Sequence, residues 1–307
     1  MNALLKDKLK HHDMNLPEIP DPLLLKSYHY NNTIPTFSII VPVFNQQDII
    51  VKNINSIIQF TGGFFEIIII LDFCYDNTEH FLLQFFDNFI YKDNKLIDVF
   101  IYKQPHLPIF EARCDNIGFI LSKARYCLEI QADMQMIQQD YNLQLLKPFL
   151  IFDNVIAVSG RCCHNFYNHN GIGKLGLGIE KTLQQLNIQT NKFYVYETCN
   201  RGPLLFDKIK LNELNYLDEL SYPLNDSDHD LMYRASLKGY INGYVPIEFI
   251  SPVNLGSTRR INNFNNINDR INMTYLSKRL NNSKYGNQVF YKARSTHITK
   301  PPQNFDI

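Results

Sequence analysis

The chain has 307 residues, which is enough for one large domain or two modest ones. Its 30 lysine and arginine residues balance 30 aspartate and glutamate residues, whereas a protein that binds nucleic acid normally presents a basic face. Because 45% of the residues are hydrophobic and only 20% are charged, wholesale disorder is also excluded.

Residues 1–34 mix short apolar clusters with three prolines, which predicts an N-terminal extension that lies on a domain. From residue 37 onward, short apolar runs alternate with segments of helical periodicity. We expect strands at 37–44, 66–71, 98–102 and 126–130, and helices at 48–60, around 81–86 and at 116–125. Nearly apolar strands that alternate with helices indicate an α/β fold whose mainly parallel central sheet is covered by helices on both faces.

The pattern loosens in the second half of the chain. We expect helices at 141–149, 179–186 and 230–238, and strands at 155–159 and 193–197. Residues 171–176 match G-x-G-x-x-G, but they follow a polar stretch and not a strand, so we interpret them as a loop. The Asn-rich tail from residue 260 is expected to be extended. The predicted organisation is an extension at 1–34, one domain at 35–260 and a second extension at 261–307.

The cysteines and the start of the chain indicate a cellular location. The six cysteines contain no C-x-x-C pair, which is typical of reduced thiols in a cytosolic protein. Residues 1–15 lack the apolar segment of a signal peptide, and no run approaches the roughly 18 apolar residues of a membrane span. We therefore expect a cytoplasmic protein without a membrane span, found in the host cytoplasm or the virion if its source is viral.

Polar residues follow three of the predicted strands. Asn45 comes directly after Phe44, Asp72 ends the second strand, and Gln131-Ala132-Asp133 follows the fourth. In a parallel α/β sheet, ligands bind at the carboxyl ends of the strands. The sequence therefore predicts one crevice that collects these side chains.

Four segments in this order resemble the family 2 glycosyltransferases of the GT-A fold, over about residues 37–260. They are SIIVPVFN (38–45), EIIIILDFCYDNT (66–78), ARCDNIGFILSKARYCLEIQADMQM (112–136), and NRGPLLFDKIKLNELNYLDE (200–219) paired with NDSDHDLMYRASLKGY (225–240). The resemblance implies a Rossmann-like domain that moves a sugar, with inversion, from a UDP-linked donor to a hydroxyl of a glycan or protein. Nucleic acid is not an expected partner, and a homodimer is one alternative for the oligomeric state.

The resemblance also assigns contacts to the nucleotide. Phe44 holds the place of the aromatic residue that stacks on uracil, and Asp72 that of the aspartate that contacts the base. The family's D-D-G-S appears as Leu71-Asp72-Phe73-Cys74, so its small residues G-S are replaced by Phe73-Cys74. Arginines near the end of the domain suit a diphosphate, because guanidinium matches phosphate oxygens. The remaining predicted nucleotide-binding residues are Pro42, Asn45, Arg113, Asn116, Gln131, Ala132, Arg259 and Arg260.

The family's metal motif, D-x-D, appears as Gln131-Ala132-Asp133, so an amide replaces the first carboxylate. Hard divalent cations take oxygen ligands, and a diphosphate supplies further ones. The resemblance therefore implies Mn²⁺ or Mg²⁺ held by Asp133 and a bound nucleotide. No histidine occurs in Phe249–Arg260, where the family often has another ligand.

Asp228 takes the position of the family's catalytic base, and Asp226 is the second candidate. An inverting transfer needs one carboxylate to take the proton of the attacking hydroxyl. Arg201 and Gly202 resemble the acceptor-side loop of the family, where glycine lets backbone approach a ligand. Two alternatives stay open. One is a degenerate GT-A domain that binds nucleotide or glycan without catalysis. The other is a nucleotidyltransferase, although its glycine- and arginine-rich loop after the first strand is missing.

Overall fold

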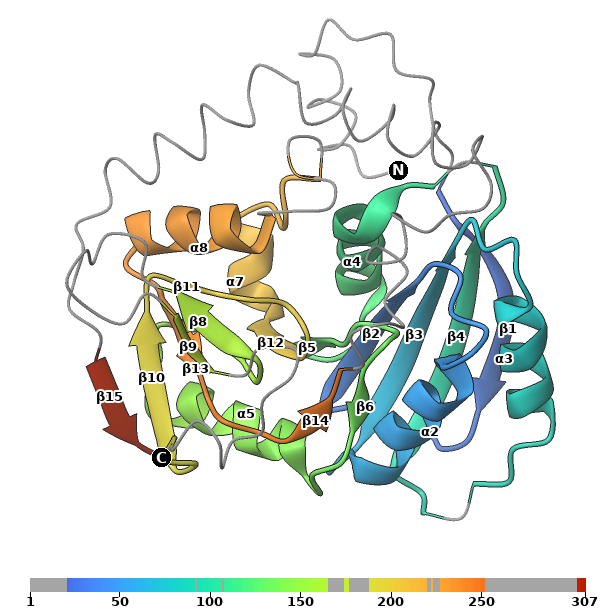
Figure 1. Cartoon of the computed structure of the whole chain (residues 1–307), viewed down its shortest axis with the longest axis horizontal. Coiled ribbons are helices and arrows are strands. Elements are labelled where there is room, and N and C mark those ends of the chain that lie inside the picture. The colour runs from blue at the N-terminus through green and yellow to red at the C-terminus, as the bar shows by residue number, and fades with distance from the viewer. Residues whose placement is uncertain are drawn as a thin grey trace, which may run out of the picture.

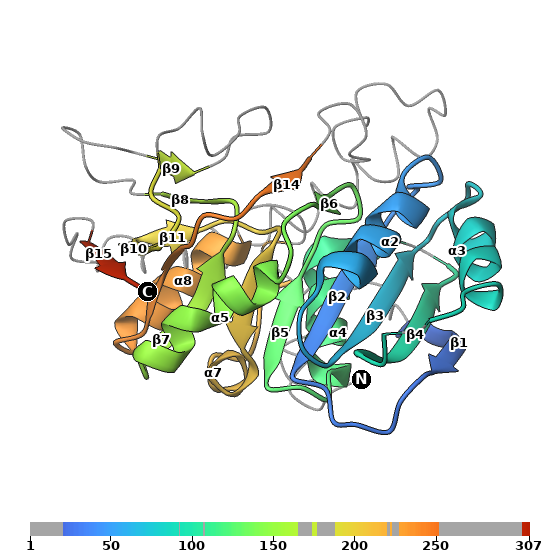
Figure 2. The same ribbon diagram turned by 90° about the horizontal axis from the view of Figure 1, so that it is seen from below.

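The computed structural model describes residues 21–91, 93–106, 108–164, 174–176, 188–219, 222, 227–251 and 303–307. A ten-stranded sheet forms its centre, with strands in the order β1-β4-β3-β2-β5-β12-β7-β13-β10-β15 (Figures 1 and 2). Helices cover both of its faces. The α/β fold expected from the sequence is confirmed.

The first half of the chain builds the part of the sheet in which β4, β3, β2 and β5 are parallel. Every residue of β3 is buried, which explains its continuous apolar run. The strands are β1 (Leu23–His29), β2 (Phe37–Val43), β3 (Phe65–Asp72), β4 (Leu96–Gln104) and β5 (Tyr126–Glu129). The helices are α2 (Ile50–Phe60), α3 (Thr78–Asp87) and α4 (Phe110–Leu121).

The second half extends the sheet with mixed directions. Strand β12 is antiparallel to both β5 and β7, and β13 runs parallel to β7. The elements are α5 (Tyr141–Ile151), β7 (Val155–Ser159), β10 (Lys192–Tyr196), β12 (Leu204–Asp207), α7 (Lys208–Glu213), α8 (Ser227–Leu237), β13 (Ile241–Tyr244) and β15 (Gln303–Asp306). Two small sheets accompany it, formed by β6 (Gln135–Met136) with β14 (Phe249–Ile250), and by β8 (Cys162–His164), β9 (Lys174–Gly176) and β11 (Thr198–Cys199).

Two cores lie on the two faces of the sheet. Helices α2, α3 and α5 pack on one face, and α4, α7 and α8 supply the apolar side chains of the other. In Figure 1, α4 and α8 lie above the sheet, and α2 and α5 lie below it. No helix within the described ranges is both long and apolar enough to cross a lipid bilayer.

Several elements, including β12, β13 and α7, are not among those that the periodicity predicts, and further differences concern β1, β15 and α4. Strand β1, within the expected N-terminal extension, is antiparallel to β4 and forms an edge of the sheet. Strand β15, near the end of the tail, forms the opposite edge beside β10. Helix α4 begins at Phe110 and not at 116, because a distant carboxylate accepts hydrogen bonds from its first amides. The helix expected at 179–186 lies outside the described residues, as do residues 171–173 of the glycine-rich loop.

Candidate active site

The candidate site lies where β2, β3 and β5 end. Strand β12 runs antiparallel to β5, and Leu204 is paired with Glu129. Residues 200–203 therefore lie beside the carboxyl end of β5 and beside residue 131. The Arg201 main chain donates to Asp228, which brings the start of α8 to the same place. Segments from both halves of the sequence thus meet at the carboxyl end of β5.

Aromatic rings lie at the end of β2. The ring of Phe44 packs edge-on against Tyr75, with ring centroids 5.9 Å apart. Asn45 has a left-handed φ of 49°, and its Oδ1 accepts a hydrogen bond from the Tyr75 amide at 3.0 Å. Pro42 is half-buried within β2. The pair Phe44 and Tyr75 supplies a partly exposed aromatic surface that can stack on a base.

Asp72 anchors the beginning of α4. Its two carboxylate oxygens accept hydrogen bonds from the amides of Ile109, at 2.7 Å, and Phe110, at 2.9 Å. These amides have no partner inside the helix, so a carboxylate stabilises them. Burial raises the pKa of Asp72 to about 7, although the two amides and the charge of Arg113 oppose the rise. Its contact with a nucleotide base stays a prediction.

Arg113 and Asn116 on α4 face the segment 217–219. The Asn116 amide donates to the Leu217 carbonyl at 2.9 Å and to Glu219 at 2.6 Å, and its oxygen accepts from the Leu217 amide. Arg113 lies 3.2 Å from Asp21 and 4.0 Å from Glu219. Both side chains therefore hold protein segments in place, and their predicted contacts with nucleotide are untested. Asp226, Arg259 and Arg260 lie outside the described residues.

The loop that carries the metal motif forms a turn held by α2. The Met134 amide donates to the Gln131 carbonyl at 3.0 Å. The fully buried Asn53 donates to the carbonyls of Gln131, at 3.1 Å, and Met134, at 2.5 Å. Ala132 and Asp133 are both buried within this turn. Asn53 thereby fixes the backbone that carries Asp133.

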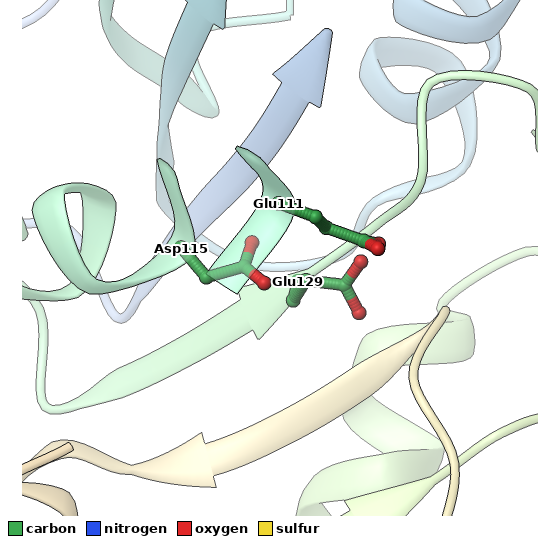
Figure 3. Close-up of side chains that lie close together, drawn as sticks. All are labelled: Glu111, Asp115 and Glu129. Atoms are coloured by element: carbon green, nitrogen blue, oxygen red, sulfur yellow. The ribbon is translucent and has the colours of Figure 1, made fainter. Parts of the chain in front are cut away.

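An acidic cluster stands next to this loop, on α4 and at the end of β5. The carboxylate oxygens of Glu111, Asp115 and Glu129 lie within 4.8 Å of one another, and the three side chains converge (Figure 3). The Arg201 guanidinium lies 3.2 Å from both Glu111 and Asp115. Glu129 accepts a hydrogen bond from the Gly202 amide at 2.9 Å. Arg201 is thus held by the cluster and is buried, although its sequence position indicates an acceptor contact.

The charges of this cluster are compensated within the protein. Burial raises the pKa of Asp115 to about 8 and raises that of Glu129 well above its ordinary value. Burial alone would lower the pKa of Arg201, but the neighbouring carboxylates raise it, so the guanidinium keeps its charge. Burial therefore favours the protonated forms of Asp115 and Glu129, whereas the neighbouring carboxylates favour the charged form of Arg201.

Two sets of residues have the oxygen donors that Mn²⁺ and Mg²⁺ prefer. One is the carboxylate of Asp133 in the predicted motif, and the other is the cluster of Glu111, Asp115 and Glu129. Two of the three cluster carboxylates already contact the Arg201 cation. A metal there would be repelled by that cation, and the metal-binding role of Asp133 stays a prediction.

Asp228 lies in the first turn of α8 and is 6% exposed. One of its oxygens accepts from the Arg201 amide at 3.2 Å, and the other from the His229 amide at 2.9 Å. Burial by itself would raise the pKa of Asp228. The charges of His229 and Arg201, together with the two amides, nevertheless hold it below its usual value. Asp228 is therefore ionised at neutral pH and can accept a proton.

The sequence analysis did not identify four side chains of the site, which are Asn53, Glu111, Asp115 and Glu129. Glu129 carries a signal, because it is a charged residue inside an apolar strand. Glu111 and Asp115 are four residues apart and so share a face of a helix, but only with α4 correctly placed. Asn53 lies in an amphipathic helix and carries no signal, since its partners are backbone atoms 78 and 81 residues away.

Solved structures with similar folds are glycosyltransferases. A mannosyltransferase from Pyrobaculum calidifontis, in complex with GDP-Man and Mn²⁺, has a TM-score of 0.52 at 13% identity, covering 87% of this chain and 71% of that chain. Residues 1–349 of TarS from S. aureus, in complex with UDP-GlcNAc, give 0.50 at 14% identity, covering 84% and 71%. GalNAc-T7 with UDP, GalNAc and Mn²⁺ gives 0.52 at 13%, covering 71% of this chain and 44% of that longer one. At these identities the likeness shows a shared GT-A fold.

A comparison with curated protein sequences found no match. A family model, Glycosyl transferase family 2, matches residues 38–194, just over half of the chain. The matched segment runs from the first parallel strand, through the loop with Asp133, into β10. This chain belongs to glycosyl transferase family 2.

Proposed function

We propose that the protein is an inverting glycosyltransferase that moves a sugar from a nucleoside-diphosphate sugar to a hydroxyl acceptor. The observation that carries this proposal is the ionised, buried carboxylate of Asp228, held beside the loop of Asp133 at the carboxyl edge of the sheet. The family match and the fold support transfer from an activated sugar. We further propose that residues 35–260 form the catalytic domain and that 1–34 and 261–307 are extensions, each of which adds an edge strand.

In this proposal each group has one task. Asp228 takes the proton of the acceptor hydroxyl as its oxygen attacks the anomeric carbon, and the diphosphate leaves from the opposite side. Phe44 and Tyr75 form the surface on which the base stacks. Asp133, whose backbone is held by Asn53, is the protein ligand for Mn²⁺ or Mg²⁺. When bound, such a cation would neutralise the charge of the departing diphosphate. Arg259 and Arg260 are proposed to bind the phosphates.

We propose a UDP-linked donor and a hydroxyl of a glycan or protein as the acceptor. The aromatic surface at the end of β2 suits a planar base. Two of the similar structures contain UDP or UDP-GlcNAc, and a third contains GDP-Man, so GDP is the nucleotide to test against UDP. A panel of UDP-sugars that includes both hexoses and N-acetylhexosamines would identify which sugar is transferred.

The test is calorimetric titration of the wild type with UDP and with GDP, each with and without Mn²⁺. We expect UDP to bind more tightly than GDP, and Mn²⁺ to strengthen the binding. The variant Asp133→Ala should lose this strengthening, whereas Glu129→Gln, in the cluster held by Arg201, should retain it. Absence of nucleotide binding by the wild type, or equal dependence on Mn²⁺ in Asp133→Ala, would contradict the proposal.

One observation favours a second candidate, a GT-A domain that binds nucleotide or glycan without catalysis. Gln131 replaces the first acidic residue of the metal motif, and its amide is engaged by Glu111 and Arg161. Release of UDP from a panel of UDP-sugars distinguishes the two functions. Tight binding of nucleotide without release, under conditions that include an acceptor panel and Mn²⁺, would favour the binding protein.

A further inference from the structure

A chain of polar contacts joins the metal-motif loop to Asp228. The Gln131 amide donates to Glu111 Oε1 at 2.9 Å. The other oxygen of Glu111 lies 3.2 Å from the guanidinium of Arg201. The main chain of Arg201 donates to Asp228, and its guanidinium donates to the hydroxyl of Ser227. Two segments about 100 residues apart in sequence are thus connected through side chains of α4 and the loop before β12.

An amide at position 131 is required for this connection. Gln131 donates to Glu111 and accepts from Arg161, whose guanidinium lies 3.3 Å away. An aspartate here, as in the family's motif, has no hydrogen to donate and would set a second negative charge against Glu111. Gln131 and Glu111 therefore form a matched pair. Gln131, which replaces the first aspartate of D-x-D, therefore occurs together with Glu111, the acidic residue on α4 that contacts Arg201.

Arg201 in turn contacts the start of α8, where Asp228 lies. Its guanidinium is buried between Glu111 and Asp115, which leaves the side chain little freedom. The backbone amide of this same residue donates a hydrogen bond to Asp228. Its guanidinium also donates to the hydroxyl of Ser227, the first residue of α8. Gly202, with φ of +63°, lets the chain turn away at this point.

We propose that Arg201 is the positioning residue for Asp228 and that the Gln131–Glu111 pair ties its position to the loop of Asp133. This inference rests on the proposed function, since it gives Asp228 the role of base. The network holds the proton acceptor in a set position relative to the donor side of the site. Misplacement of such a group by about 1 Å can lower turnover about 100-fold.

The titratable groups around Asp228 come from five segments of the chain. They are His229 on α8, Arg201 in the loop before β12, Asp115 on α4, Cys162 and His164 on β8, and Cys199 on β11. Burial lowers the pKa of His164 to about 4, so this ring is neutral above that pH. Removal of the Arg201 charge therefore leaves Asp228 more basic, and the acidic limb of the pH profile of kcat/KM should move to higher pH.

The first experiment compares Arg201→Met and Arg201→Lys with a matched control, Arg234→Met. Arg234 lies on α8, the helix that carries Asp228, and it pairs with Asp230 at 2.8 Å and with carbonyls of the 214–216 turn. We expect Arg201→Met to lower kcat by about 10- to 100-fold, with the donor KM within about twofold and the acidic limb displaced upward. Arg201→Lys should recover part of the loss. Arg234→Met should lose stability but retain kcat and the pH profile of its folded fraction.

The second experiment exchanges the amide and the acid. Gln131→Asp restores the family's motif, yet we expect it to lower kcat by about tenfold, because the connection to Glu111 breaks. Adding Glu111→Gln to Gln131→Asp restores a donor and an acceptor, so the double variant should recover most of the lost kcat.

The outcomes separate this inference from the function on which it rests. A wild type that releases no UDP from any donor overturns the proposed function and the inference together. An active wild type whose Arg201→Met variant keeps kcat and its pH profile overturns the inference alone. So does a Gln131→Asp variant more active than the wild type. Unchanged circular dichroism and urea unfolding of the folded variants exclude loss of structure as the cause of a lower kcat.

Discussion

Asp228 is a buried acid that keeps its charge because donors surround it. Two backbone amides and the charges of His229 and Arg201 more than offset the effect of burial on its pKa. Asp115, equally buried, lacks backbone donors in the described contacts, and burial raises its pKa to about 8. The pKa values of two carboxylates near the same arginine therefore shift in opposite directions, and the one whose pKa is lowered suits a proton acceptor.

Asp228→Asn tests this role at the level of one atom. The amide keeps the shape of the side chain but cannot take a proton, so we expect kcat to fall by at least about 100-fold. Because the change lies away from the rings of Phe44 and Tyr75, the Kd for UDP with Mn²⁺ should stay within about twofold. Steady-state turnover and calorimetry check the two statements. Normal turnover of Asp228→Asn would mean that Asp228 is not the base.

Gly202 is required by both its backbone and its surroundings. Its φ is +63°, and a Cβ atom there would lie 2.7 Å from Met134 Cε in the metal-motif loop. We expect Gly202→Ala to lower the free energy of unfolding by about 1–3 kcal/mol, measured by urea unfolding. Gly239 is a matched control, because its φ is +81° and nothing lies within 4 Å of a Cβ placed there. If Gly239→Ala costs as much as Gly202→Ala, the contact with Met134 has no energetic weight.

At the scale of elements, β1 contacts β4 through a titratable side chain, that of His29, which faces Asp98. Both ring nitrogens of His29 face oxygens, Nδ1 that of Asp98 at 2.6 Å and Nε2 that of Asn32 at 2.9 Å. Lys123 shares the same carboxylate of Asp98 at 2.6 Å. The hydrogen bond to Asp98, followed by that to Asn32, raises the pKa of His29, because the charged ring can donate to both oxygens. The attachment of β1 to β4 should therefore depend on pH.

The sign of this dependence follows from the raised pKa of His29. A histidine whose pKa is higher in the folded state stabilises that state below its unfolded pKa, about 6.5, and loses the contribution as the pH rises through the folded value. The difference in free energy of unfolding between wild type and His29→Asn should therefore be larger at about pH 5.5 than at about pH 8.5. Urea unfolding at both pH values measures it. A difference that grows with pH would contradict the assignment, and Asp98→Asn should abolish the dependence.

At the scale of the whole molecule, one sheet joins segments from the two ends of the chain. Strand β1 forms one edge and β15 the other, while the candidate site lies between them where β5 meets β12. The ring of Phe305 in β15 packs on Phe152 with centroids 5.0 Å apart, and Asp306 lies 2.7 Å from Lys192. Residues 303–307 thus cover the edge that β10 would otherwise expose.

Deletion of residues 303–307 tests this edge. The truncated chain loses the ladder with β10 and the contact of Phe305, so we expect the free energy of unfolding to fall by about 1–3 kcal/mol. Amide hydrogen exchange should become faster in 192–196 and stay unchanged in 37–43, at the centre of the sheet. Asp306→Asn is the control, since an ion pair of an exposed carboxylate contributes at most about 1 kcal/mol. Unchanged exchange in 192–196 after the deletion would show that β15 does not protect this edge.

Much of the fold could be predicted from local patterns in the first half of the chain. Strands β2, β3, β5 and β7 were expected within one or two residues, because each is an apolar run in a sheet whose two faces are covered by helices. Strand β1 was not, since most of its residues are exposed and its partner is distant in sequence. The start of α4 could not be predicted either, because the carboxylate that anchors it, Asp72, lies 37 residues earlier.

The sequence by itself determined the α/β class, the family resemblance, and the strand ends that carry Phe44, Asp72 and Asp133. These features depend on local residue order, because burial and turn formation act over a few neighbours. Only the tertiary structure decided that Arg201 is buried among Glu111, Asp115 and Glu129, and that Gln131 hydrogen-bonds one of them. The hydrogen-bond partners of a carboxylate or an amide, and the pKa of the carboxylate, depend on the groups that folding brings within a few ångströms. Glu111, Gln131 and Arg201 lie on three separate segments, so the residue order within each segment does not specify their contacts.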